Sequence, residues 1–106
     1  MTNTRVTTNK EVSLTETAVK VYLFDGGMDL SVSTVPEGRV IFTVRNDGRV
    51  SHDFSVEGLA DFGRITPRSS HTFELDFTEG EYTLYSPREL DRRLEMYETL
   101  YVESSK

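Results

Sequence analysis

Short runs of alternating apolar and polar residues constrain the fold of this chain more than any other feature. Residues 39–46 and 70–77 both alternate in this way, apart from the apolar Ile41. A period of two places successive side chains on opposite faces of a β-strand, so one face of each run is apolar. The residues expected to face the core are Val40, Phe42, Val44, Phe73, Leu75 and Phe77. This pattern predicts paired strands packed over a core.

Turn signals and further strand-like segments extend this pattern along the chain. Additional strands are expected at residues 5–12, 18–24, 29–32, 52–56, 81–85 and 99–102, and residues 58–67 read as a connection. Seven or eight short strands at regular turn spacing predict an all-β Greek-key sandwich or barrel. The length of 106 residues suits a single domain over 1–106, with loose tails at 1–4 and 103–106.

A helix start signal interrupts the strand pattern near the C-terminus. Ser86 is a suitable N-cap, a proline follows at the first helical position, and Glu89 is placed to reach back to the cap. Leu90 and Leu94 then recur at helical spacing and define an apolar stripe. We therefore expect one short helix at about residues 87–97, before the last strand.

Composition and charge exclude several classes of function. The formal net charge is −6, with twelve basic residues scattered among eighteen acidic ones, which argues against a nucleic-acid partner. No apolar run approaches the roughly 18 residues that a membrane helix needs. The absence of cysteine excludes disulfides, thiolate metal sites and a cysteine nucleophile. The first residues lack the apolar segment of a secretory signal, so a cytoplasmic protein is expected if Met1 is the native start.

Three blocks of the sequence, in the right order, together resemble the cupredoxin pattern. Residues 35–48 read VPEGRVIFTVRNDG and lead to SHDF, similar to a Pro-x-Gly turn, a strand, Asn-x-Gly and the first copper-binding histidine, here His52. Residues 80–87 read GEYTLYSP, similar to Gly-x-Tyr-x-aromatic followed by Cys-Pro. Residues 96–102 read MYETLYV, similar to the Met-x-Gly-x-x-x-Val end of the fold. The resemblance covers roughly residues 19–102.

The resemblance implies a cupredoxin-like domain of the plastocyanin, azurin and rusticyanin type whose type 1 copper site is degenerate. The ligand loop of the family, Cys-x4-His-x4-Met, falls on Ser86, Asp91 and Met96, so only His52 and Met96 match the copper ligands. A hydroxyl cannot supply the thiolate on which blue-copper chemistry depends. The resemblance therefore implies a redox-inactive binding or scaffolding module that is not an enzyme and has no cofactor.

Other interpretations of the same residues stay open. His52, Met96 and Asp91, with His71 or Glu95, would form a copper, zinc or nickel site without a thiolate, for metal handling or electron transfer. A designed helix in place of the ligand loop would also explain the strong capping signal.

Three further patterns could indicate a catalytic site, a calcium site or another sandwich family, and each has a second interpretation. Ser86 with His52 as base would make a nucleophile, although capping already explains the serine. The carboxylates that suggest calcium are turn-associated and match no calcium loop; they are Asp25, Asp29, Asp47 and Asp53. The Thr78-x-Gly80-x-Tyr82 pattern also fits the tyrosine corner of an immunoglobulin-like sandwich.

The expected helix is the best candidate for a contact surface. In the family, the end that carries the copper loop is where redox partners dock, so the resemblance implies a protein partner at this end. The expected partner surface comprises Arg88, Glu89, Arg92 and Glu95. The resemblance also implies a periplasmic or extracellular location.

Overall fold

The computed structural model describes residues 16–88, 91, 94 and 96–104 of the chain. These residues form nine strands, which are β1 (Glu16–Phe24), β2 (Gly27–Leu30), β3 (Thr34–Pro36), β4 (Gly38–Asn46), β5 (His52–Val56), β6 (Ala60–Ile65), β7 (Ser70–Phe77), β8 (Gly80–Tyr85) and β9 (Tyr97–Glu103). The strand expected at residues 5–12 and the tail at 1–4 lie outside the described residues. Glu103, expected in a tail, belongs to β9.

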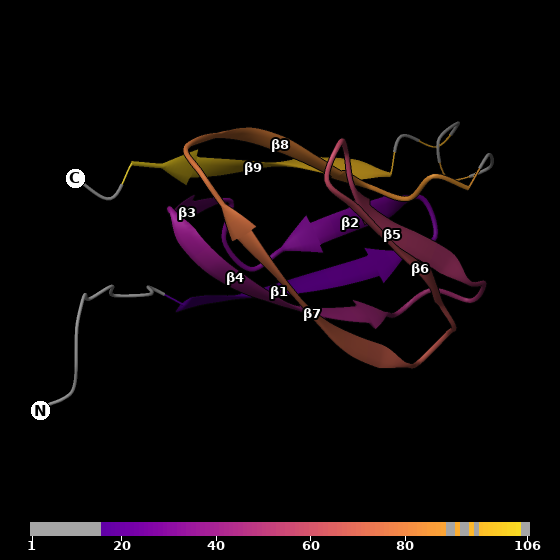
Figure 1. The fold of residues 1–106 in the computed structure, drawn as a ribbon. Helices are drawn as coiled ribbons and strands as arrows, with labels where there is room; N and C mark the ends of the chain where they lie inside the picture. The colour runs from indigo at the N-terminus through magenta and orange to yellow at the C-terminus, as the bar shows by residue number, and fades with distance from the viewer. Residues whose placement is uncertain (1–15, 89–90, 92–93, 95, 105–106) are drawn as a thin grey trace, which may run out of the picture.

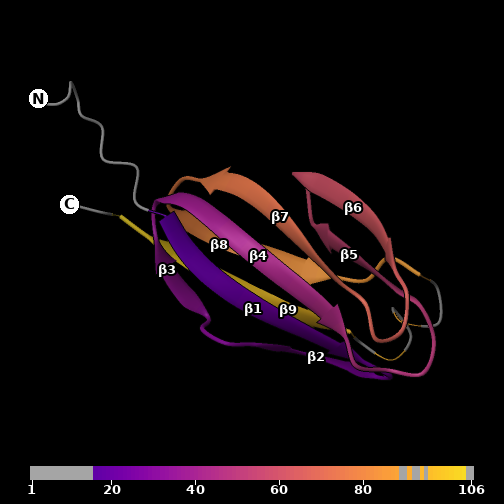
Figure 2. The ribbon, with the colours of Figure 1, turned by 90° about the horizontal axis from the view of Figure 1, so that it is seen from below.

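The strands form two facing sheets, ordered β2-β1-β4-β7 and β3-β9-β8-β5-β6 (Figures 1 and 2). The β1–β4 and β3–β9 pairs are parallel, and the other pairs are antiparallel. Parallel neighbours need crossovers between the sheets, because a hairpin joins only antiparallel strands. The predicted all-β sandwich is confirmed.

The core lies between the two sheets and follows the alternation of the sequence. Val40, Phe42 and Val44 on β4 are fully buried, as expected for a central strand. On β7, Phe77 is buried while Phe73 and Leu75 are only partly buried. Because β7 is an edge strand, it has a neighbouring strand within its own sheet on one side only.

The tyrosine-corner hydrogen bond is present at the turn between the sheets. The Tyr82 hydroxyl donates to the Thr78 carbonyl at 2.8 Å, and the ring packs edge-on against Phe77 with centroids 4.8 Å apart. This contact fixes the passage of the chain from β7 to β8, which lie in different sheets.

Two strands were not predicted. Strand β6 lies within the range expected to be a connection, and it pairs with β5 across a β-bulge. The register shifts at Phe54 and Ser55, and Gly63 has a φ of 86°, so β6 lacks clean alternation. Strand β3 has only three residues and ends in Pro36, which reads as a turn signal in the sequence.

The helix predicted at residues 87–97 is not confirmed, and its expected range is wrong at both ends. Pro87 and Arg88 are not helical, and Tyr97 already belongs to β9. Residues 89, 90, 92, 93 and 95 of the expected helix lie outside the described residues. The expected stripe is also wrong at Leu94, which is 48% exposed. Within the described ranges, no helix is long and apolar enough to cross a membrane.

Candidate functional site

Four segments that are distant in sequence meet at one end of the sandwich. Asp25 follows β1, His52 begins β5, Ser86 follows β8, and Met96 precedes β9. This end lies opposite the one where the chain emerges from β9 toward the C-terminus (Figure 1). His52, Ser86 and Met96 are all at most 1% exposed, so their side chains belong to the interior.

The His52 ring is held between two carboxylates. Its Nδ1 lies 2.7 Å from Asp91 Oδ2, and its Nε2 lies 2.8 Å from Asp25 Oδ1. An ionised carboxylate only accepts hydrogen bonds, so only a doubly protonated ring satisfies both contacts. Such hydrogen bonds between charged groups are among the stronger ones in proteins.

Ser86 and Asp91 complete the cluster on the other side. The Ser86 hydroxyl donates to Asp91 Oδ2 at 2.6 Å and accepts from the Asp53 backbone N–H at 3.1 Å. Asp91 is only 2% exposed, so its carboxylate lies in the interior. The serine hydroxyl cannot cap a helix here, because it is directed into the interior toward this buried carboxylate.

The backbone around Asp91 and Met96 closes the connection between β8 and β9. The Asp91 carbonyl accepts from the N–H groups of Leu94 and Met96 at 3.2 and 3.0 Å, and the Ser86 N–H donates to the Met96 carbonyl at 3.2 Å. The chain therefore folds back with Asp91 inward. The apolar Leu94 turns outward as a consequence.

Asn46 and Gly48 position the histidine from the preceding loop. The buried Asn46 amide donates to the carbonyls of Val50 and Ile65, both at 2.9 Å, and its oxygen accepts from the Gly48 N–H at 2.8 Å. A Cβ at Gly48 would collide with the Asp25 carboxylate and lie 3.0 Å from His52 Nε2. The loop therefore needs glycine where it crosses the Asp25–His52 pair.

Asp25 is the exposed end of the cluster, with a side chain that is 42% exposed. Its oxygens accept from the Arg49 backbone N–H at 2.9 and 3.1 Å. This backbone hydrogen bond, followed by the one from His52, holds the pKa of Asp25 below its ordinary value. Asp25 therefore ties the β1–β2 turn to the β4–β5 loop.

Replacing Asp25 with asparagine should reduce the amount by which the free energy of unfolding falls as the pH is lowered into the acid range. A carboxyl with a lowered folded-state pKa contributes stability above its unfolded-state value of 3.8, and loses it as the pH falls through the folded-state pKa. Denaturant unfolding of both proteins across the acid range measures this. The difference should be modest, because the exposed carboxylate is screened by solvent. An Asp29→Asn control on β2 should leave this pH dependence unchanged.

The arrangement does not fit a copper ion as a resident group. Asp91 Oδ2 lies at the point on which His52 Nδ1 and Ser86 Oγ both converge. The donor atoms are thus directed at a carboxylate oxygen, and Ser86 supplies a hydroxyl that donates a hydrogen bond instead of a thiolate lone pair. A metal at this point would have to displace the carboxylate and break both hydrogen bonds.

The structure brings together some of the predicted site residues and separates others. His52, Asp91 and Met96 meet at this end with Ser86. His71 is exposed on β7, where its ring lies 6.2 Å from that of Phe73. Of the expected partner surface, Arg88 is half-buried, while Glu89, Arg92 and Glu95 lie outside the described residues.

The nucleophile and calcium interpretations are not supported. The fully buried Ser86 donates to Asp91 and makes no hydrogen bond to His52. Of the turn carboxylates, Asp47 pairs with Arg45 at 2.7 Å, and Asp29 is exposed on β2. Over the described ranges, no group of three histidine, cysteine or acidic residues is arranged to hold a metal ion.

Sequence reasoning missed Asp25 as part of the site. Its position before two glycines marks a turn, and nothing in the sequence links it to a histidine 27 residues away. The Asn-x-Gly signal before His52 appears in the sequence as one part of the cupredoxin pattern. It also marks the loop in which Asn46 and Gly48 position the histidine.

Comparisons with known proteins identify solved structures of similar fold. No protein-family model matches the sequence, and no curated protein is significantly similar to it. A dithionite-reduced auracyanin from Roseiflexus castenholzii matches with a TM-score of 0.70 and 11% identity, covering 86% of this chain and 99% of that one. A domain of a heme-copper terminal oxidase matches with a TM-score of 0.64 and 11% identity, covering 91% and 76%.

A multicopper oxidase is also similar, with a TM-score of 0.62 and 18% identity over 86% of this chain. The chain spans only 42% of that oxidase. Auracyanin is a cupredoxin, and identities this low establish the fold alone. The chain has a cupredoxin-like fold.

Proposed function

We propose that this chain is a redox-inactive cupredoxin-like binding or scaffolding module, in which a hydrogen-bonded cluster joins the loops that a copper ion joins in the family. The observation that carries the proposal is the position of Asp91 Oδ2, 2.7 Å from His52 Nδ1 and 2.6 Å from Ser86 Oγ. One carboxylate oxygen thus links the segment after β8 to the start of β5. His52 extends the linkage to the turn after β1 through Asp25.

The chemistry of the side chains supports a role without electron transfer. The sequence contains no cysteine, so no thiolate is available for type 1 copper chemistry. None of the serine, aspartate and histidine side chains changes oxidation state under ordinary conditions. The cluster therefore supplies structure, and the activity of the chain is assigned to its surfaces.

Exposed apolar side chains at the same end support binding of a protein partner there. Val50 and Leu94 are each 48% exposed, and Phe24 is 37% exposed. All three lie in or beside the segments that carry the cluster, and exposed apolar groups that gather in one region are typical of interaction surfaces. The partner surface of Arg88, Glu89, Arg92 and Glu95 remains part of this proposal.

The second candidate function is metal binding without a thiolate. The burial of His52 and Met96 at the same end favours it, since both residue types bind copper. Asp91 would supply an oxygen ligand after losing its contacts with Ser86 and His52. This requirement makes the metal site the weaker candidate.

Titration with Cu(II), and separately with Zn(II), distinguishes the two candidates. We expect neither ion to produce a saturable rise in melting temperature, because the donor atoms are occupied by one another. A ligand that binds only the native state would raise the melting temperature by mass action. A one-to-one shift that disappears in both His52→Ala and Met96→Ala would establish the metal site and refute the proposed module.

A further inference from the structure

The outer face of β8 and β9 carries aromatic side chains that the core does not use. Leu84, Leu100 and Val102 point inward and are buried, so the alternating residues between them point outward. Among these outward residues, Tyr97 is 53% and Tyr101 is 44% exposed. Both lie on β9, four positions apart.

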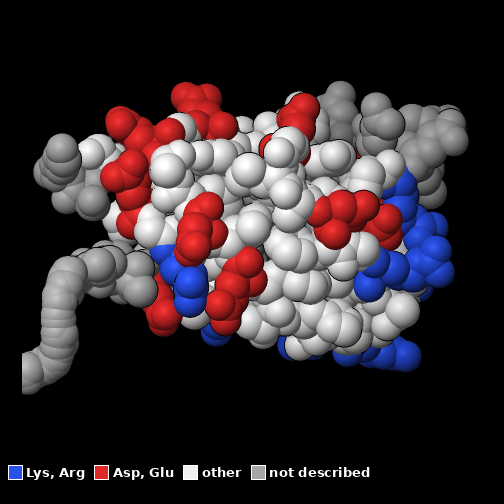
Figure 3. Space-filling model, viewed as in Figure 1, with Lys and Arg blue, Asp and Glu red and all other residues white. Residues whose placement is uncertain are grey.

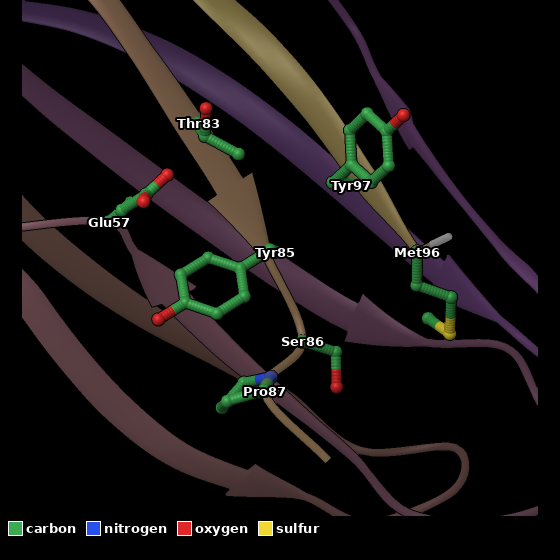
Figure 4. Close-up of a pocket in the computed structure, with 7 residues that line it drawn as sticks. All are labelled: Glu57, Thr83, Tyr85, Ser86, Pro87, Met96 and Tyr97. Carbon is green, nitrogen blue, oxygen red and sulfur yellow. The ribbon is translucent and has the colours of Figure 1, made fainter. Parts of the chain in front are cut away.

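A cavity of about 380 Å³ opens on this face beside the end of β8. Tyr85 and Tyr97, which are direct partners across the β8–β9 ladder, line it together with Thr83 and Glu57. Figure 4 shows the Glu57 side chain on the same side as the Tyr85 ring, with the Tyr97 ring on the other side. Among the residues that the structure describes, no ion pair or side-chain hydrogen bond engages the Glu57 carboxylate.

A second hollow of about 390 Å³ lies further along the same two strands. Its lining includes Tyr101 and Glu81, which are again direct cross-strand partners. Each hollow therefore combines a tyrosine with a carboxylate. At a rise of about 3.3 Å per residue, Tyr97 and Tyr101 are separated by about 13 Å. The Thr83–Thr99 pair lies between them and presents small polar side chains.

The charge of this face is uniformly acidic. Strands β8 and β9 contain no lysine or arginine, whereas their outward residues include Glu81 and Glu103. Figure 3 shows acidic side chains along the top of the molecule, where β8 and β9 lie, while most basic side chains in this view lie at the loop end. The face is thus complementary to a cationic ligand.

The combination of an aromatic ring with a nearby carboxylate suits an organic cation. A guanidinium or ammonium group is attracted to the face of a tyrosine ring, and it also pairs with a carboxylate. Arginine combines stacking and directed hydrogen bonds better than lysine does. Two such hollows about 13 Å apart match two side chains four residues apart in an extended peptide, which has the same rise per residue.

We propose that the outer face of β8 and β9 binds an extended basic segment of a partner protein, with arginine or lysine side chains at positions i and i+4. One cation enters the hollow of Glu57, Tyr85 and Tyr97, and the other enters the hollow of Glu81 and Tyr101. The inference rests on the proposed function in treating the chain as a binding module. It uses the outer face of β8 and β9, and its first hollow adjoins the Asp25–His52–Asp91–Ser86 cluster through Ser86, which lines that hollow together with Met96.

A synthetic peptide with two arginines four residues apart in a serine and glycine background tests the proposal. We expect saturable binding by fluorescence anisotropy at low salt. Glu57→Gln, which keeps the size of the side chain, and Tyr97→Ala should each weaken binding about two- to fivefold. The matched control is Asp29→Asn, which makes the same charge change on β2 in the other sheet and should leave affinity unchanged.

Two further comparisons make the test decisive. Peptides with the arginines two residues apart, or with one arginine replaced by glutamine, should bind more weakly. Absence of binding, equal loss in Asp29→Asn, or indifference to spacing would overturn the proposal. These variants leave His52, Ser86 and Asp91 intact. The peptide experiment can therefore fail without changing the expected result of the metal titration. In the same way, a positive metal titration would not change the expected binding of the peptide.

Discussion

A double variant with Ser86→Cys and Asp91→His is expected to bind Cu(II) and to show the intense visible absorption of a copper–thiolate bond. The two changes supply the donor types that the family uses at these positions, while His52 and Met96 are already present and buried. Removing the Asp91 carboxylate also frees His52 Nδ1 from its 2.7 Å contact. Absorption titration with Cu(II), with folding checked by circular dichroism, measures the gain.

The single variants and a triple variant control this experiment. Ser86→Cys alone retains the Asp91 carboxylate at the point where the donors converge, so its copper band should be weak or absent. Adding His52→Ala to the double variant should abolish the band. If the folded double variant binds no copper, the loop end does not retain ligand geometry, and the description of the cluster as a replacement for the metal is wrong.

The second large effect is expected from His52→Ala, which should lower the free energy of unfolding by about 3–5 kcal/mol. The reason is that the change removes the hydrogen-bond partner of Asp91, a side chain only 2% exposed, and leaves that buried polar group without His52 Nδ1. It also breaks the link from Asp91 to Asp25. Urea denaturation at neutral pH measures the loss.

The matched control is His71→Ala on β7. His71 is exposed, and its ring contact is with Phe73 near the edge of the sandwich, so a change within about 0.5 kcal/mol is expected. Equal losses in the two variants would contradict a structural role for the cluster. A His52→Ala variant as stable as the parent would do so as well.

The fold follows from sequence features wherever a strand alternates cleanly between two turns. Residues 39–46 correspond to β4 and residues 70–77 to β7, and the buried faces are the predicted ones. Strand β6 could not be predicted from the sequence, because the bulge opposite Phe54 interrupts the alternation with a period of two. Strand β3 could not be predicted either, because three residues are too few to show an alternation of apolar and polar residues.

The site was only partly predictable, because local signals and tertiary contacts compete for the same residues. The Ser86 and Glu89 pattern is a valid capping signal, yet the serine hydroxyl forms a buried hydrogen bond with Asp91. The resemblance to a copper-ligand loop located Ser86, Asp91 and Met96 at one end of the fold. It gave no indication of Asp25, whose role depends on a turn brought close by the β1–β4 pairing.

The protonation of the His52 ring tests the central claim most directly. Nitrogen-15 NMR of the side chain in mildly acidic solution should show hydrogens on both Nδ1 and Nε2, since the ring donates to two carboxylates. Adding Cu(II) or Zn(II) should leave both signals at their positions. A ring that carries one hydrogen, with a free nitrogen whose signal moves or disappears on adding metal, would contradict the account and identify His52 as a metal ligand.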